Sequence, residues 1–193
     1  MNNQINTSIV ALEEQLRRYS QNLENQKLGL VPTSTSFLKC LSEGTEVKIS
    51  ACDGTLLMKD ATNIFPGNID GDFENFGLNV PQAATPETLV RVFEITRDGL
   101  WPQFFTSFNH GLYDLALTRM QIAKYVEENS MWLHPKDNST LFLTEENDEF
   151  FLVSACNPAS EREVYVSRFD YSRVWGAVRT YRLVVPQYVP VVS

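Results

Sequence analysis

The sequence predicts an α+β protein in which antiparallel strands and hairpins pack on a central buried helix, with an N-terminal amphipathic helix. Three observations support this fold class. Residues 111–130 carry apolar side chains around most of a helical circumference, residues 139–185 contain four β-rich runs with short connections, and residues 5–23 show a heptad rhythm. Short connections favour an antiparallel meander, and a helix that is apolar on most sides must be covered by other elements.

The N-terminal segment has the a/d spacing of a coiled coil, with apolar residues separated alternately by four and three positions. The residues of this seam are Ile5, Ile9, Leu12, Leu16, Tyr19 and Leu23. Gly29 and Pro32 end the helix, so we expect a helical arm over residues 1–30 and a single α+β domain over residues 31–193. A narrow apolar stripe on an otherwise polar helix predicts that the helix packs against another helix or along the surface of a domain. Two interpretations stay open: the arm folds back on its own domain, or it pairs with another protein or with a second copy as a homodimer.

The first part of the domain is predicted to hold a short helix, a hairpin and a long loop. Serines and threonines at residues 33–36 can cap a helix that runs through Leu41. Alternating residues on both sides of Asp53-Gly54 predict a hairpin over 45–60. Residues 62–86 are rich in glycine and proline and form an irregular loop, and loops of this length tend to be either functional or mobile.

Residues 87–96 have two interpretations. Pro86 is typical of a helix start, but the β-branched run from Leu89 to Thr96 favours a strand. We favour the strand, followed by a turn at Asp98-Gly99 and a partner strand within residues 100–108. The central helix over 111–130 follows, and Pro135 ends it at the latest.

The remaining chain predicts a strand series. Residues 139–144 and 149–155 flank an acidic turn, residues 162–169 form the next strand, and residues 173–185 close the series. No repeat of fixed period interrupts it.

Composition limits the class of protein and its partners. The chain has 193 residues, is 43% hydrophobic and carries a formal net charge of −8, which argues against general binding of duplex nucleic acid. It has no apolar run of membrane-spanning length and no secretory signal. Three widely spaced cysteines indicate reduced thiols. We therefore expect a cytoplasmic protein without a membrane partner, while export by a route without a cleavable signal stays open.

A catalytic site is only weakly indicated. His110, Cys52 and Cys156 are the residues that could supply a nucleophile and a base, and a hydrolase-like enzyme would place them under the 62–86 loop. No metal-binding or nucleophile motif has the required spacing, and no phosphate-binding glycine motif is present. We expect no cofactor.

Metal binding is not expected either, although one loop offers oxygen ligands. Asp70, Asp72 and Glu74 alternate along a glycine-containing segment, which suits a hard cation such as Ca²⁺. The EF-hand pattern requires glycine at the sixth position and glutamate at the twelfth, where this chain has Phe73 and Asn79. Turn formation is the ordinary explanation for these residues.

The C-terminal segment interleaves arginines and aromatic residues, which is typical of surfaces that bind single-stranded nucleic acid or another anionic ligand. From residue 161 onward there are five arginines and three acidic residues, a local charge of +2 against −10 for the preceding residues. The candidate residues are Arg168, Tyr171, Arg173, Trp175, Arg179, Tyr181 and Arg182. Pairing among strands of the sheet would use the same side chains.

The function favoured by these patterns is a non-enzymatic protein-interaction or regulatory module that self-associates or binds a protein partner through its N-terminal helix. Two alternatives follow from the other patterns. One is binding of single-stranded nucleic acid or an anionic ligand on the C-terminal sheet segment, and the other is a hydrolase-like activity under the 62–86 loop.

Overall fold

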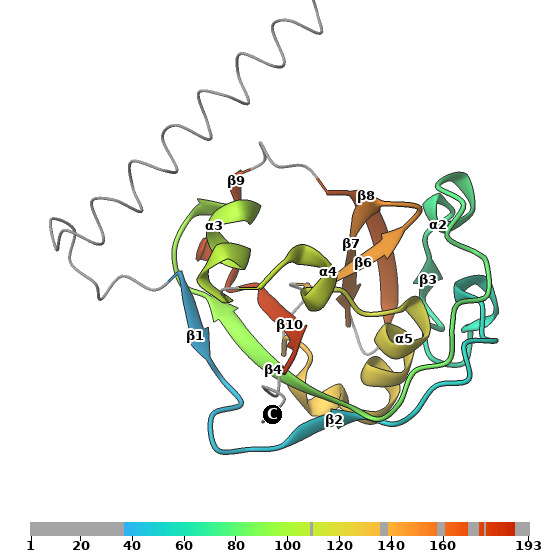
Figure 1. Ribbon diagram of the computed structural model, residues 1–193, viewed down its shortest axis with the longest axis horizontal. Helices are drawn as coiled ribbons and strands as arrows, with labels where there is room; N and C mark the ends of the chain where they lie inside the picture. Colours follow the sequence, from blue (N-terminus) through green and yellow to red (C-terminus); the bar gives the residue numbers. More distant parts are fainter. Residues whose placement is uncertain are drawn as a thin grey trace, which may run out of the picture. The chain divides into compact units, whose positions relative to one another are not determined.

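The computed structural model describes residues 37–108, 110–135, 139–157, 161–169, 174–175 and 177–187. The predicted N-terminal arm with its seam, and the candidate residues Tyr171 and Arg173, lie outside these ranges. The described chain is mostly β-sheet (Figure 1). Its strands are β1 Leu38–Cys40, β2 Val47–Ile49, β3 Asn68–Ile69, β4 Thr88–Ile95, β5 Gly99–Leu100, β6 Thr140–Glu146, β7 Glu149–Cys156, β8 Glu163–Arg168, β9 Val174–Trp175 and β10 Arg182–Pro186.

The helices of the described residues are short, and none is long and apolar enough to cross a membrane. The α-helices are α2 Asp72–Asn75, α3 Trp101–Phe105, α4 Leu112–Leu115 and α5 Arg119–Glu128. The single-turn 3-10 helices are η1 Met58–Asp60, η2 Thr106–Phe108, η3 Ser130–Trp132 and η5 Ala177–Arg179.

Eight strands form one mixed sheet in the order β1-β4-β10-β6-β7-β8-β3, and β2 also pairs with β4. The pairs β10–β6 and β3–β8 are parallel and the others are antiparallel. The last strand, β10, lies between β4 and β6 because Leu183, Val184 and Val185 are consecutive apolar residues that suit a strand covered on both faces. Strands β5 and β9 form a separate two-stranded sheet.

The expected α+β fold with a central helix is wrong, because the sheet and not a helix occupies the centre. Alternate residues of β10 belong to two different cores: Val184 packs with α5 and the segment before β4, whereas Leu183 packs with the aromatic residues of α3. Trp101 lies in this second core, with its ring 4.8 Å from that of Trp175. Figure 1 shows β4, β10, β6 and β7 following one another across the molecule, with short helices and loops around them.

The predicted helix over 111–130 is broken in the middle. Helix α4 stops at Leu115, and Leu117 is instead extended and donates from its N–H to the carbonyl oxygen of Leu143 at 2.8 Å. Thr118 then begins α5 with a capping box: its side chain accepts from the N–H of Gln121, whose side chain accepts from the N–H of Thr118. Helix α5 ends at Glu128, well before Pro135.

The strand predictions are confirmed where turn residues define them locally. Strands β6 and β7 form the predicted hairpin, and Asn147 and Asp148 adopt positive φ values of 54° and 65°, as a two-residue hairpin turn requires. Strand β8 follows in the predicted place, and residues 87–96 form a strand, β4. Residues 173–185 are not continuous, since η5 separates β9 from β10.

Two predicted hairpins and one predicted helix are wrong. Gly54 does turn the chain with φ 80°, but Cys52 bridges to Thr85 and β2 pairs with β4, so residues 45–60 form no hairpin. Of residues 100–108, Leu100 belongs to β5, which pairs with β9, and the others form α3 and η2 instead of a partner strand for β4. Residues 38–40 form β1 at the edge of β4 rather than a helix through Leu41.

Candidate functional site

A pocket of about 230 Å³ opens beside β4 and β10, next to η2 and α4. We call it the Arg91 pocket. Its lining residues are Arg91, Phe93, Phe108, His110, Leu115, Val185, Pro186 and Gln187. Apolar and polar side chains both line it, so the pocket can hold a small ligand that is part apolar and part polar.

The alternation of β4 places two pocket residues on one face of the sheet. Arg91 and Phe93 point away from the face that carries Val90 and Val92, because successive strand residues face opposite sides. Val185 on β10 is the cross-strand partner of Arg91. The strand pairing therefore fixes the arginine beside an apolar surface.

Part of the pocket lining is apolar. Leu115 and Val185 are each only 2% exposed and form an apolar floor. The rings of Phe93 and Phe108 meet edge to face, with their centroids 5.0 Å apart. This packing joins η2 to β4 and holds one wall in place.

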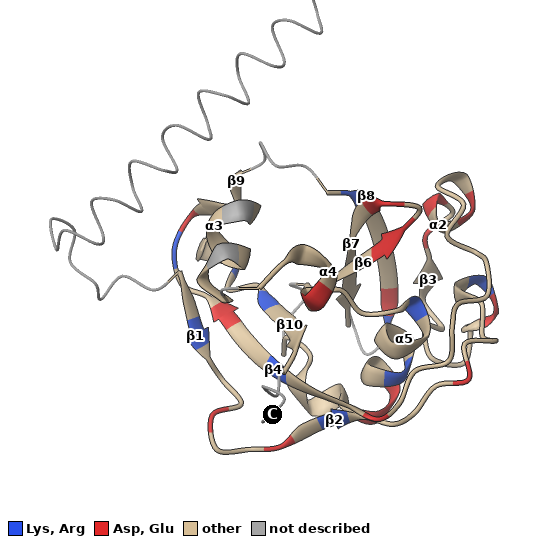
Figure 2. Ribbon diagram, in the orientation of Figure 1, with Lys and Arg blue, Asp and Glu red and all other residues tan. Residues whose placement is uncertain are grey.

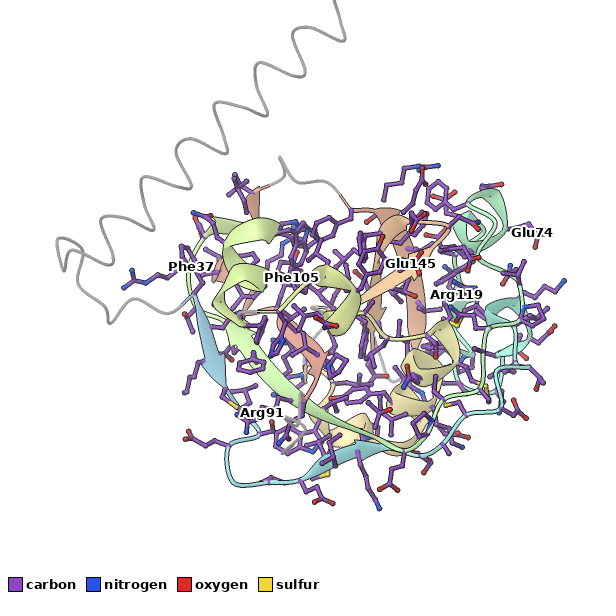
Figure 3. All side chains as sticks on the ribbon, viewed as in Figure 1. Phe37, Glu74, Arg91, Phe105, Arg119 and Glu145 are labelled. Carbon is purple, nitrogen blue, oxygen red and sulfur yellow. The ribbon has the colours of Figure 1, made fainter. Side chains whose placement is uncertain are left out.

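Arg91 lies at the rim of this pocket and has no counter-ion among the residues that the structure describes. Its side chain is exposed, and no carboxylate among the described residues lies within 4.0 Å of it. Arg119 and Arg168, by contrast, form ion pairs with Glu146 and Glu149. Figure 3 labels Arg91 near β4 and Arg119 on the other side of the molecule, and Figure 2 shows acidic residues on β4 and between β1 and β2 as well as around α2.

The three candidate catalytic residues have separate surroundings. Cys52 is buried, bridges to Thr85 and donates from Sγ to the carbonyl oxygen of Ser50 at 3.4 Å; burial raises the pKa of its thiol. Cys156 ends β7, where its Sγ lies 3.8 Å from a carboxylate oxygen of Glu163. His110 lines the Arg91 pocket. Within the described ranges, no group of three or more His, Cys, Asp and Glu residues is arranged to hold a metal.

The aromatic candidates of the C-terminal segment are part of the core. Trp175 and Tyr181 are 7% and 8% exposed, and their rings meet at 5.1 Å. Arg179 donates to the hydroxyl oxygen of Tyr181 at 3.3 Å. These aromatic faces are covered by the protein itself.

Two further candidate arginines of that segment, Arg168 and Arg182, also bind within the protein. Arg182 donates from Nη1 to the carbonyl oxygens of Trp132 and Leu133, at 2.9 and 2.7 Å. Arg168 pairs with Glu149, and its guanidinium lies 5.1 Å from the ring centroid of Phe76. The described residues of the segment thus make the cross-strand and capping contacts of a folded sheet.

The carboxylates proposed as metal ligands make local hydrogen bonds. Asp70 accepts from the N–H of Asp72 at 3.1 Å and from the N–H of Val166 at 3.2 Å, so both of its oxygens are used. Asp72 accepts from the side chain of Asn75 at 2.9 Å. Glu74 and Asp70 line a second pocket, which lies in the 62–86 region where a site was expected.

Sequence reasoning missed Arg91, although one local signal exists. Arg91 stands between Val90 and Val92, and strand alternation places its charge on the same face as the partly buried Leu89 and Phe93. The pairing with β10 and the approach of η2, which complete the pocket, depend on residues far away in the chain.

No protein-family model, no curated protein and no solved structure matches the chain. The chemistry of the Arg91 pocket is therefore the main indication of function. A guanidinium presents several N–H donors in a plane and binds carboxylate or phosphate oxygens in pairs. An apolar floor beside it favours a ligand that also carries a hydrophobic body.

Proposed function

We propose that this protein is a binding module for a small ligand that joins an anionic group to an apolar or aromatic body. The ligand occupies the Arg91 pocket, with its anion on the guanidinium of Arg91 and its body over Leu115 and Val185. The observation that carries this proposal is the position of an exposed arginine, without a described counter-ion, at the rim of a pocket whose floor is apolar.

The size of the pocket limits the ligand. Typical small-molecule pockets measure about 300–1,000 Å³, so a volume of about 230 Å³ suits a single ring or a short branched chain. Phe93 and Phe108 form the aromatic wall against which such a ring packs edge to face. A folded macromolecule would contact only the rim.

Benzoate and benzamide test the proposal, because they share a ring and differ mainly in charge. We expect benzoate to shift the amide resonances of residues around Arg91 and Leu115 in a nuclear magnetic resonance titration, and benzamide to bind more weakly. Arg91→Gln is expected to weaken benzoate binding by about tenfold, the equivalent of one charge-assisted contact near the surface. Binding is also expected to weaken as salt is added.

Arg97→Gln is the matched control, since it removes the same charge from an exposed residue that does not line the pocket. It is expected to leave benzoate binding unchanged. Equal binding of benzoate and benzamide, or equal loss in the two variants, would show that Arg91 does not recognise the anion.

We also propose that the N-terminal seam joins this binding module to a second copy. The support is the a/d spacing of its six apolar residues on an otherwise polar segment. Deleting residues 2–28 is expected to convert a dimer to a monomer, as measured by light scattering. A monomeric full-length protein would end this proposal without affecting the Arg91 pocket.

A further inference from the structure

A second pocket, of about 400 Å³, lies at the other end of the molecule from Arg91; Figure 3 labels Glu74 there, beside α2. We call it the Lys59–Glu74 pocket. Its walls come from η1, β3, the start of α2 and the connections between them. The lining residues are Lys59, Thr62, Phe65, Pro66, Gly67, Asn68, Ile69, Asp70, Gly71, Glu74 and Asn79.

Hydrogen bonds hold the irregular walls of this pocket in place. Asn79 connects two sides: its Oδ1 accepts from the N–H of Lys59 at 3.1 Å and its Nδ2 donates to Glu74 Oε2 at 3.2 Å. Asp70 fixes the third side by accepting from two backbone N–H groups, on α2 and on β8. Phe65 is only 2% exposed and anchors the segment in the core. The polar groups are therefore positioned before a ligand arrives.

The rim offers both hydrogen-bond donors and acceptors. Among the described residues, Lys59 Nζ has no carboxylate within 4.0 Å, and Glu74 uses one oxygen for Asn79 and keeps the other. Thr62 and Asn68 add exposed groups that can donate and accept. This set contrasts with the Arg91 pocket, where one cation stands beside an apolar floor.

The two signs of charge disfavour a ligand with one net charge. An anion that approaches Lys59 also meets Glu74 and Asp70, and a cation meets Lys59. Hydroxyl groups fit such a rim, because each hydroxyl can donate to a carboxylate or amide oxygen and accept from an ammonium or amide group. We propose that the Lys59–Glu74 pocket binds an uncharged polyhydroxylated ligand of the size of a monosaccharide. This proposal is independent of the ligand of the Arg91 pocket.

Glycine 71 provides a variant that blocks the pocket without removing any of its polar groups. Gly71 has an ordinary φ of −62°, and a Cβ built there meets nothing within 4 Å, so a side chain can extend from the wall. Gly111→Trp is the matched control: φ is −67° and the nearest heavy atom to a Cβ is 3.5 Å away, but the residue does not line this pocket.

The experiment is a nuclear magnetic resonance titration of the full chain with D-glucose, D-galactose and D-mannose, each alone. At least one sugar is expected to shift amide resonances within residues 59–79 and not those around Arg91. Gly71→Trp is expected to abolish these shifts, and Gly111→Trp to leave them unchanged. Glu74→Gln keeps an oxygen for Asn79 but removes the anionic acceptor, so it is expected to weaken binding about threefold or more.

Three results would overturn the proposal. The first is the absence of shifts within residues 59–79 with all three sugars. The second is binding that Gly71→Trp and Glu74→Gln both leave unchanged. The third is a response of these residues to L-serine, a zwitterion, without a response to the sugars.

Discussion

The buried arginine of α5 allows a quantitative test of how the hairpin β6–β7 is attached to the rest of the fold. Arg119 is only 2% exposed, and its Nη2 donates to Glu146 at 2.9 Å and to the carbonyl oxygen of Val80 at 3.3 Å. Its Nη1 is buried and has no hydrogen-bond partner within the described part of the chain. Glu146→Ala would therefore leave a buried guanidinium with only one weak acceptor.

The expected loss of unfolding free energy in Glu146→Ala depends on how deeply Arg119 and Glu146 are buried. Removing one member of a buried ion pair costs about 3–5 kcal/mol. The Glu146 side chain keeps 21% exposure, so water replaces part of the contact and we expect a loss of about 2–3 kcal/mol. Arg119→Met removes the buried charge together with its unpaired Nη1, and we expect the free energy of unfolding to change by less than about 1.5 kcal/mol. The double variant with Glu146→Ala and Arg119→Met should lose little more unfolding free energy than Arg119→Met alone.

Urea unfolding followed by tryptophan fluorescence measures these differences, since Trp101 and Trp175 are both buried. Glu146→Ala is expected to lower the midpoint by about 1 M. Glu87→Ala, which breaks an exposed pair with Lys48, is the control and should cost less than about 1 kcal/mol. The reasoning is refuted if Glu146→Ala lowers the free energy of unfolding no more than Glu87→Ala does, or if Arg119→Met lowers it as much as Glu146→Ala does.

Three further substitutions or measurements test separate features. Thr118→Ala removes the cap that accepts from the N–H of Gln121, and we expect it to lower the free energy of unfolding by about 1 kcal/mol. An unchanged melting temperature in thermal unfolding would contradict the role of the cap. Gly54→Ala is expected to lower the free energy of unfolding by more than about 1 kcal/mol, because φ is 80° and a Cβ would lie 2.0 Å from the carbonyl oxygen of Gln82. Wild-type stability of this variant in calorimetry would disprove this expectation. Burial raises the pKa of the Cys52 thiol, so a thiol reagent should modify Cys52 last of the three cysteines in the native protein. Cys52→Ala should therefore remove the slowest phase of the modification reaction. Because its folded-state pKa lies above the unfolded-state value, the stability linked to this thiol is complete below the unfolded-state pKa and is lost as the pH rises through the folded-state pKa.

Local turn chemistry made parts of the sheet predictable. The acidic turn of Asn147 and Asp148 permits positive φ, and the runs on either side alternate in the way that a hairpin requires. Strand β8 and the β-branched strand β4 could be recognised for similar reasons. The order of the strands in the sheet could not be predicted, because β10 pairs with β4 and β6, which lie far from it in the sequence.

The predicted central helix shows where periodicity alone misleads. Apolar residues surround the segment from Leu112 to Val126, and a broken helix and a continuous one give the same pattern. The break is nevertheless encoded: Thr118 and Gln121 have the spacing of a capping box, which marks a helix start. The parallel bridge between Ala116 and Leu143 completes the interruption and depends on tertiary contact.

The candidate sites were predictable only in part. The length of the 62–86 loop predicts either a functional or a mobile segment, and a pocket lies in this region, lined by Asp70 and Glu74 among others. Binding of an anionic ligand to the C-terminal arginines stays an alternative prediction, and Arg168 and Arg182 also make contacts within the protein. Arg91 is an exposed arginine beside an apolar floor. Only the three-dimensional pairing of strands distinguishes an arginine that is used internally from one that is available.

A crystal structure with 4-bromobenzoate tests most directly whether the Arg91 pocket is the ligand site. The anomalous signal of bromine locates the ring, and the carboxylate identifies its partner. We predict bromine over Leu115 and Val185, with the carboxylate on the guanidinium of Arg91. Bromobenzoate bound only at Arg168, Arg179 or Arg182, or an empty Arg91 pocket at saturating ligand, would contradict the account.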